Sequence, residues 1–230
     1  LGEGADKNLK AISAFSASNI GNYYISTKFA KSKESEIYKA WAWGNYKYQS
    51  KSKKNLLYVK EQKELEFLTF YSDCINFSRD LINSPANKLN PSTYYSKIKN
   101  NNLFKSFNFI DYTEKEINSN FPLTCAVGKS SSLRPKVIEI TNRKLSKKDK
   151  PLVIIGKGVT FDTGGVNIKP GTSMRNMKKD MGGSAIAISL FLLANYFLKK
   201  TKIVLIAPIA ENAISSLSLI HISEPTRRRT

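Results

Sequence analysis

Four side chains that could act together chemically lie in one short part of the sequence: Lys157, Asp162, Lys169 and Asp180. The two aspartates lie beside pairs of glycines, which let a backbone approach a ligand closely. Divalent cations prefer carboxylate oxygens, and two carboxylates can begin a two-metal cluster. Lys157 could join as a neutral amine if a nearby cation lowered its pKa, and a protonated Lys169 could stabilise negative charge on a polarised carbonyl. The alternative is that all four are solvated charges on a glycine-rich loop.

The same glycines could instead indicate a phosphate-binding loop, because "GKGVTFDTGG" follows an apolar run. A P-loop has the form G-x-x-x-x-G-K-[ST], whereas here the lysine precedes the loop. The dinucleotide pattern G-x-G-x-x-G also fails, since Phe161 stands where the third glycine is needed. An aspartate directed at a phosphate would repel it, so the sequence favours a metal site.

Short apolar runs of the kind found in buried strands flank the four residues. They cover residues 107–112, 136–141, 152–158 and 202–212. A strongly apolar helix is predicted over residues 182–200, between the last two runs. Strand, loop, helix and strand form a βαβ unit, which predicts an α/β fold with a helix-covered, mainly parallel sheet. The glycine-rich segment leaves the carboxyl end of a strand, where open α/β sheets bind ligands.

The N-terminal part of the chain is predicted to be mainly helical. Ala, Lys and Ile recur at helical spacing over residues 5–50, and a long helix is expected over residues 61–83. Between them, "NLLYVK" (residues 55–60) has the composition of a short strand. Pro91 favours the start of another helix, over residues 92–99.

The charge of the chain could indicate a nucleic-acid partner, since 37 basic and 18 acidic residues give a formal charge of +19. Only seven of the basic residues are arginines, and the lysines are spread among many Asn, Ile and Tyr. All of these residues have AT-rich codons, so genomic base composition accounts for the profile without a selected basic surface. We therefore do not expect nucleic acid to be the main partner.

The cysteines and the apolar runs bear on the cellular setting. Cys74 and Cys125 lie in apolar surroundings without metal-like spacing, which predicts two reduced thiols in a cytoplasmic protein. No run reaches the length of about 20 apolar residues that a membrane span needs, and residues 186–198 are predicted to form a buried helix. We therefore expect no membrane partner.

The segment "VIIGKGVTFDTGGVNIKPGTSMRNMKKDMGGSAIA" (residues 153–187) closely resembles the metal-binding core of the leucyl aminopeptidase family, the cytosolic M17 peptidases. The family pattern is roughly V-G-K-G-x-T-F-D-S-G-G-x-x-x-K-P, followed by M-x-x-M-K-x-D-M-x-G-A. Thr163 replaces the usual serine and Ser184 the usual alanine. The resemblance extends over residues 79–216, through "SRDLINSPANKLNPSTY" and "KIVLIAPIAEN", and is weaker over residues 1–60.

The resemblance implies an enzyme that releases leucine and similar N-terminal residues from peptides with a free N-terminus. By position, Lys157, Asp162 and Asp180 would ligate two divalent ions, with Asp162 bridging them. Lys169 would be the electrophilic lysine that stabilises the gem-diolate formed when metal-activated water attacks the peptide carbonyl. Met177 would line the pocket for the first side chain of the substrate. The metals would be zinc or manganese, or else magnesium or cobalt, with bicarbonate as the general base in a cytoplasmic homohexamer.

The family's second metal-binding motif, N-T-D-A-E-G-R, is expected after the position of Asp180 and does not occur in the 230 residues. It would supply an Asp and a Glu ligand, together with the arginine that holds bicarbonate. We therefore expect this chain by itself to bind metal weakly, to hydrolyse no peptide and not to form the hexamer.

The last residues, "LSLIHISEPTRRRT", differ from the rest, since they contain the only histidine and three of the seven arginines. Residues 217–227 match the translation of a common transposase sequencing adapter, which excludes His221 from a catalytic scheme. The expected organisation is the helical end of an N-terminal α/β domain with a linker (residues 1–60), the incomplete first half of a metallo-aminopeptidase domain (residues 61–216) and an adapter-derived tail (residues 217–230).

A second class of protein is a non-catalytic, basic binding module for nucleic acid that keeps an aminopeptidase-like core. The intact set of Lys157, Asp162, Lys169 and Asp180 argues against it, because such a module does not need all four. Nucleic-acid affinity with a steep salt dependence would support it.

Overall fold

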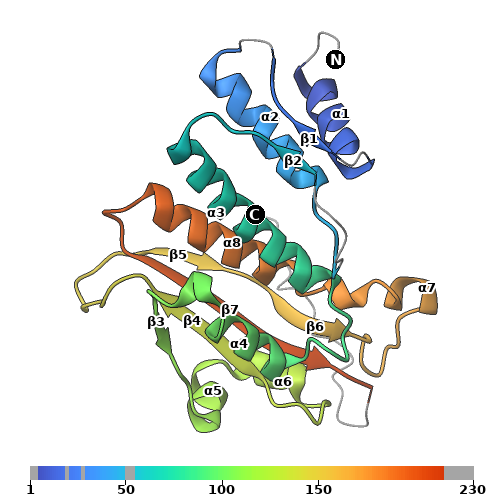
Figure 1. Ribbon diagram of the computed structural model, residues 1–230. Helices are drawn as coiled ribbons and strands as arrows, with labels where there is room; N and C mark the ends of the chain where they lie inside the picture. The colour runs from blue at the N-terminus through green and yellow to red at the C-terminus, as the bar shows by residue number, and fades with distance from the viewer. Residues whose placement is uncertain (1–4, 19–20, 27–28, 50–54, 215–230) are drawn as a thin grey trace, which may run out of the picture. The chain divides into compact units, whose positions relative to one another are not determined.

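The computed structural model describes residues 5–18, 21–26, 29–49 and 55–214, so the adapter-like tail lies outside the described residues. Helices and strands alternate along most of this length (Figure 1). In chain order they are α1 (Ala5–Ser18), β1 (Asn22–Tyr23), α2 (Lys31–Gly44), β2 (Leu56–Leu57), α3 (Gln62–Asn83), α4 (Pro91–Lys99), η1 (Asn102–Phe104), β3 (Asn108–Ile110), α5 (Glu114–Asn120), α6 (Pro122–Gly128), β4 (Lys136–Thr141), β5 (Leu152–Ile155), β6 (Gly158–Asp162), α7 (Gly171–Met174), η2 (Met177–Lys179), α8 (Gly182–Phe197) and β7 (Ile203–Asn212).

The chain divides into two compact units, residues 1–80 and residues 81–230. The division falls inside the long helix α3, which was predicted over residues 61–83 and is confirmed. The domain boundaries expected from the sequence stay predictions. Each unit has its own buried residues, and the four candidate site residues all belong to the second unit.

The first unit is built on two helices that cross closely. A side chain at Gly44 of α2 would meet the backbone of α1, because a Cβ there would lie 1.9 Å from the carbonyl oxygen of Ser13. Trp41 and Ile12 are buried between the helices, and the ring of Tyr23 lies 5.0 Å from that of Trp41. The helical prediction is confirmed for α1 and α2, and the strand expected over residues 55–60 is present as β2. The strand β1, which pairs in parallel with β2, was not predicted.

The second unit is built on a five-stranded sheet with the strand order β3-β4-β7-β5, in which β6 also pairs with β7. The ten-residue strand β7 pairs with β4 along one side and with β5 and then β6 along the other. The predicted α/β class is confirmed, but the strand directions are mixed: β5 and β6 run parallel to β7, whereas β4 runs antiparallel to it. Only ten residues without a helix connect β4 to β5, and a parallel crossover needs a dozen or more.

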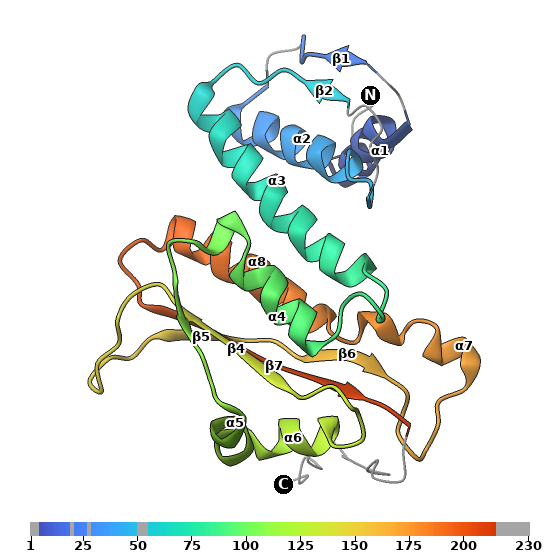
Figure 2. The same ribbon diagram turned by 60° about the horizontal axis from the view of Figure 1, so that its bottom comes forward.

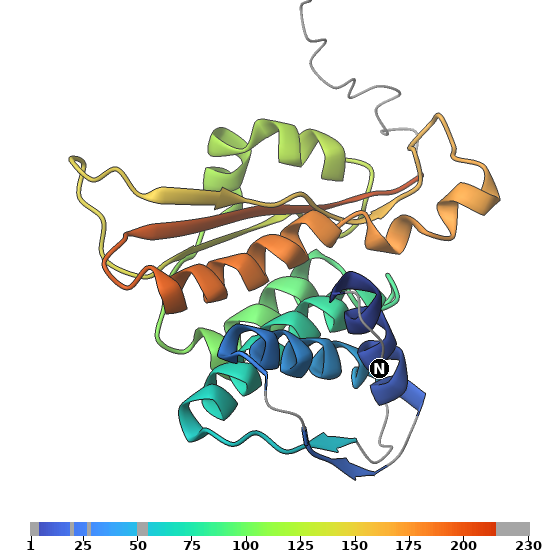
Figure 3. The same cartoon turned by 90° about the horizontal axis from the view of Figure 1, so that it is seen from above.

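Helices cover both faces of this sheet, as Figure 2 shows. In Figure 3 the sheet is seen nearly edge-on, with α4 and α8 on one side and α5 and α6 on the other. The core between α8 and the sheet is aliphatic and aromatic: Ile188 and Phe191 are fully buried, as are Leu205 and Ile209 of β7. The predicted helix-covered sheet is therefore present.

Helix α8 has two apolar sides of different burial. Ile188, Phe191 and Leu192 are buried on the sheet, whereas Ile186 and Leu190 are exposed. Residues 177–197 are long and apolar enough to cross a membrane by length and composition alone. Because one side of the helix packs into the core of the unit, we describe α8 as a core helix. It ends at Phe197, three residues earlier than predicted, where two lysines begin the turn into β7.

Candidate metal centre

A break between two strands positions Lys157. Strands β5 and β6 run along the same side of β7, and Gly156 and Lys157 lie between them. The break brings α8 close, because a Cβ at Gly156 would lie 2.5 Å from the Cα of Ser184. The carbonyl of Lys157 accepts a hydrogen bond of 2.8 Å from the backbone N–H of Ser184, in the first turn of α8. The backbone of Lys157 is thus fixed to the helix that follows Asp180.

A β-bulge precedes Asp162 and sets its direction. Between Val159 and Asp162, two residues of β6 face a single residue of β7. Such bulges turn a strand locally and are common next to active sites. The loop that follows turns back through Gly164 and Gly165, whose φ angles of 86° and 66° favour glycine. The side chain of Asp162 therefore projects where the strand ends and the glycine loop begins.

A short 3₁₀ helix and the glycine loop before it position the other three residues of the centre. Met177 begins η2, and Asp180 follows directly after it, two residues before α8. Lys169 lies at the end of the glycine loop, and its N–H donates a hydrogen bond of 2.9 Å to the carbonyl of Thr163. Strand, loop and 3₁₀ helix thus bring together residues that are up to 23 positions apart.

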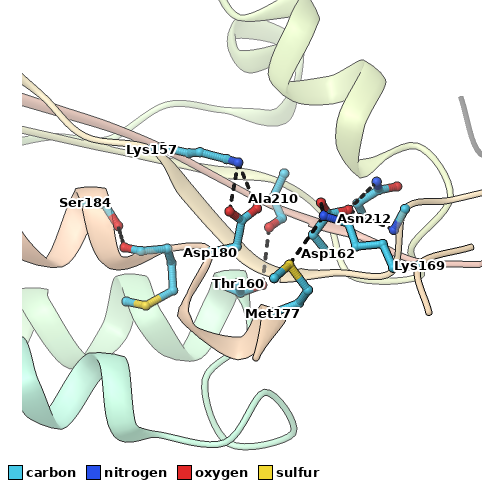
Figure 4. Close-up of polar contacts among 11 residues, drawn as sticks. Lys157, Thr160, Asp162, Lys169, Met177, Asp180, Ser184, Ala210 and Asn212 are labelled. Atoms are coloured by element: carbon cyan, nitrogen blue, oxygen red, sulfur yellow. Dashed lines mark hydrogen bonds and ion pairs between the residues drawn. The ribbon is translucent and has the colours of Figure 1, made fainter. Parts of the chain in front are cut away.

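Two lysine–aspartate ion pairs form the centre, as Figure 4 shows. The ammonium of Lys157 lies 2.9 Å from each carboxylate oxygen of Asp180. That of Lys169 lies 2.6 Å from Oδ2 of Asp162 and 3.4 Å from the sulfur of Met177. The structure therefore gathers all five residues that the sequence singled out, but their ligand and catalytic roles stay predictions.

Asp162 is held by several donors at once. Its Oδ1 accepts hydrogen bonds of 3.0 Å from the N–H of Gly164 and 2.7 Å from Nδ2 of Asn212, while Lys169 binds its Oδ2. Partial burial acts to raise the pKa of the Asp162 carboxyl, but these hydrogen bonds and the charge of Lys169 outweigh it and hold the pKa below its ordinary value. Asp162 is therefore stabilised as an anion.

Asp180 is held differently, because the ammonium of Lys157 contacts both oxygens of its carboxylate. Its Oδ2 is buried and receives no hydrogen bond of good geometry, although the ammonium of Lys157 lies 2.9 Å away. A buried carboxylate oxygen without a hydrogen bond is uncommon in folded proteins. It is the kind of atom that a bound cation would satisfy.

Two polar contacts of the centre were not predicted from the sequence. Asn212, the last residue of β7, donates to Asp162 and accepts from Thr163 through its carbonyl, the N–H and hydroxyl lying 3.0 and 2.8 Å away. The buried hydroxyl of Tyr94 in α4 lies 2.7 Å from that of Ser184, which donates to the carbonyl of Met181 at 2.7 Å. The "EN" at the end of the last apolar run was the only sequence signal for Asn212.

The donor set fits part of a metal site. Two carboxylates and one amine can ligate a divalent ion, and Oδ2 of Asp180 is a buried carboxylate oxygen that contacts the ammonium of Lys157. Among the residues that the structure describes, no three His, Cys, Asp or Glu side chains lie close enough to hold a metal together. A bound ion would therefore use the amine of Lys157, or ligands from outside these residues.

Comparison with known proteins assigns the family. The model of the cytosol aminopeptidase family, catalytic domain, matches residues 76–221. This match covers more than half of the sequence and includes every residue of the centre, so the chain belongs to the cytosol aminopeptidase family.

The curated relatives are much longer than this chain. The probable cytosol aminopeptidase of Corynebacterium glutamicum is 37% identical over 142 residues, which are 61% of this chain and 28% of the relative. That of Aquifex aeolicus is 32% identical over 160 residues, which are 64% of this chain and 32% of the relative. The chain thus spans under a third of these relatives.

Solved structures share the fold over most of this chain. The crystal structure of the cytosol aminopeptidase from Coxiella burnetii matches with a TM-score of 0.77 and 27% identity, over 92% of this chain and 48% of that one. The bottromycin maturation enzyme BotP in complex with Mn matches with a TM-score of 0.77 and 21% identity, over 94% of this chain and 50% of that one. The second similarity shows the fold alone.

Proposed function

We propose that the second unit forms one side of the active site of a metal-dependent aminopeptidase that removes leucine and similar residues from peptides with a free N-terminus. The observation that carries this proposal is the pair of ion pairs Lys157–Asp180 and Lys169–Asp162, within a domain of the cytosol aminopeptidase family. Solvated surface charges would not need a bulge, two left-handed glycines and a buried carboxylate oxygen to support them.

Lys157, Asp162 and Asp180 are the residues that would hold two divalent ions, with Asp162 between them. Bound ions would polarise the peptide carbonyl and lower the pKa of a water molecule. Manganese and zinc suit this mixed set of oxygen and nitrogen ligands, and magnesium or cobalt could replace them. BotP, which shares the fold, was solved with Mn.

Lys169 is the residue that would act on the substrate directly. In the structure its ammonium is bound to Asp162, at the end of the glycine loop. A protonated amine there can donate to the carbonyl oxygen of the first peptide bond and stabilise the negative charge that develops on it. Met177, whose sulfur contacts the same ammonium, would pack against the first side chain of the substrate.

The 230 residues alone lack part of this machinery. They contain no Asp-Ala-Glu-Gly-Arg sequence, so two carboxylate ligands and the arginine that would hold bicarbonate are not supplied. We propose that the isolated chain binds metal weakly, does not hydrolyse peptides and does not form the hexamer proposed for the full-length enzyme. Relatives are named cytosol aminopeptidases, which supports a cytoplasmic location.

Metal titration of the purified chain tests the site. Mn²⁺ binding, followed by the loss of the free-ion electron paramagnetic resonance signal, should weaken by about 100-fold or more in both Asp162→Asn and Asp180→Asn, because each removes a ligand. Asp111→Asn is the matched control, since Asp111 forms an exposed ion pair with Lys99 at 2.6 Å. Equal Mn²⁺ binding by all four proteins would refute the site.

Leucyl-anilide hydrolysis tests the second part of the proposal. The purified chain should show no turnover with Mn²⁺ or Zn²⁺ present. Turnover above a metal-free control would show that the ligands within the 230 residues suffice, and the inactivity proposed for the isolated chain would be wrong.

A further inference from the structure

Two lysine-rich segments meet at the end of the sheet that lies away from the metal centre. One is the β4–β5 loop, residues 142–151, and the other is the turn after α8, residues 198–202. Figures 1 and 2 show both at the end opposite to α7. The side chain of Asn142 joins them, because it donates to the carbonyl of Thr201 and accepts from the N–H of Ile203, both at 2.9 Å.

The positive charge of this end is largely uncompensated. The two segments contain a single acidic residue, Asp149, which is bound to the ammonium of Lys202 at 2.6 Å. That hydrogen bond and those from Ser146 hold the pKa of Asp149 at about 2, so it stays an anion paired with Lys202. Seven other cations are exposed: Arg143, Lys144, Lys147, Lys148, Lys150, Lys199 and Lys200. The fold thus brings two lysine-rich segments, separated by 46 residues in the sequence, to one end of the sheet.

Bulky apolar side chains are exposed among these cations. Phe197 is 64% exposed and Leu198 is 44% exposed. The two residues stand next to each other, just before Lys199. In the loop, Leu145 is 39% exposed and lies within "KLSKK". Both segments therefore present an exposed apolar residue followed by two lysines, "LSKK" and "FLKK". We define these three apolar residues and the seven cations as the basic end of the sheet.

We propose that the basic end of the sheet binds the surface of a bilayer that contains anionic phospholipids. Clustered lysines are attracted to anionic head groups, and exposed Phe and Leu side chains beside them can enter the boundary between head groups and acyl chains. Such binding needs no spanning segment, so it differs from the expectation of no membrane partner, which rested on span length. The metal centre lies at the other end of the sheet, and this proposal is independent of the proposed function.

The composition of the basic end favours lipid over nucleic acid. Six of its seven cations are lysines, whereas recognition of phosphate with defined geometry favours the planar fork of arginine. Two of its three apolar residues, Leu145 and Leu198, are aliphatic and cannot stack on bases, which leaves Phe197 as the one ring of the basic end that could do so. Exposed lysines beside exposed apolar side chains match an anionic membrane surface better than they match nucleic acid.

Co-sedimentation with vesicles tests the proposal on the whole chain. Phosphatidylcholine vesicles containing phosphatidylserine should bind the chain, and pure phosphatidylcholine vesicles should not. The variant Lys144→Gln/Lys147→Gln/Lys148→Gln should bind about tenfold more weakly or worse. The matched control Lys63→Gln/Lys115→Gln/Lys129→Gln removes three exposed lysines elsewhere and has the same net charge as the first variant, so it should bind nearly as the wild type.

A second variant, Leu145→Ser/Phe197→Ser, separates insertion from simple charge attraction. It should weaken vesicle binding about fivefold or more while leaving binding to a single-stranded oligonucleotide unchanged. Equal weakening by the two lysine variants would show an effect of net charge only. Tighter binding to the oligonucleotide than to anionic vesicles would assign the surface to nucleic acid. No effect of the serine variant on vesicle binding would show charge attraction without insertion of apolar side chains. Each of these results would overturn the proposal.

Discussion

The two lysine–aspartate pairs of the centre contain the same residue types but are supported in different ways. Asp162 is fixed through its carboxylate, by Lys169, Asn212 and the N–H of Gly164. Asp180 has one oxygen without a hydrogen bond, and it contacts an ammonium whose side chain is 61% exposed. Its place is set instead by its backbone, between η2 and α8.

The difference indicates which carboxylate is fixed before a ligand arrives. Hydrogen bonds to a carboxylate orient it and stabilise its charge, whereas a single exposed ammonium can leave at little cost. Asp162 is therefore preorganised as an anion, and Asp180 is the oxygen donor that can exchange its partner. A centre of this kind can rearrange on one side while the other stays in place.

Removing the lysine of each pair should give the largest difference in stability between the two ion pairs. Lys169→Met leaves a half-buried carboxylate without its cation, which should lower the free energy of unfolding by about 1–3 kcal/mol. Lys157→Met removes a more exposed partner and should cost under about 1 kcal/mol. Urea unfolding followed by circular dichroism measures both. Equal losses would show that the two pairs do not differ as described.

The contribution of the buried hydroxyl pair Tyr94–Ser184, which joins α4 to α8, can be measured by removing each hydroxyl in turn. Ser184→Ala leaves the hydroxyl of Tyr94 without a partner, so it should lower the free energy of unfolding by about 1–2 kcal/mol. Tyr94→Phe in the same background should recover part of that loss, since no unpaired hydroxyl then remains. Denaturation of the single and double variants measures this, and strictly additive losses would contradict it.

Asn212 should contribute to stability through the Lys169–Asp162 pair and not through the Lys157–Asp180 pair. Asn212→Ala removes one charge-assisted hydrogen bond and should lower the free energy of unfolding by about 1 kcal/mol. In combination with Lys169→Met the losses should be non-additive, because both side chains bind one carboxylate. With Lys157→Met the losses should add. Additivity in both combinations would show that Asn212 does not support Asp162.

The pH dependence of stability should show the smallest effect. The native pKa of Asp162 lies below its ordinary value of 3.8, so the carboxylate contributes stability above that value and loses it as the pH falls toward the native pKa. Stability of the wild type should therefore fall in this acid range more steeply than that of Asp162→Asn. Unfolding by urea between pH 5 and pH 3 measures the slopes, which would be parallel if the pKa of Asp162 were the same in the folded and unfolded states.

Short stretches of sequence were enough to predict the strands made of apolar runs and the helix that begins at a proline. Continuous apolar runs gave β4 and β7 close to their observed bounds and the start of β5, and Pro91 gave the start of α4. The strand β6 was not predicted, because its residues were assigned to the glycine-rich loop. The direction of β4 did not follow from composition, because it depends on the length and helix content of the connection to β5. The helices α5 and α6 are short and were not predicted.

Spacing and family pattern predicted the residues of the centre, but not what supports them. Lys157, Asp162, Lys169 and Asp180 come from one continuous segment, so a motif can include them. Asn212 and Tyr94 reach the centre from other elements, and nothing in the sequence near them shows which residue each will contact. The basic end of the sheet was missed for the same reason, since two separate lysine-rich segments form it.

The position of β7 in the chain has a consequence for folding during synthesis. This strand lies between β4 and the pair β5 and β6, yet it is the last of these to leave the ribosome. Among the strands that the structure describes, β5 and β6 pair with β7 alone and β4 pairs with β7 and β3, so before residues 203–212 emerge only β3 and β4 can pair. Until then the apolar strands β5 and β6 remain unpaired, and unpaired apolar strands make a chain prone to aggregate.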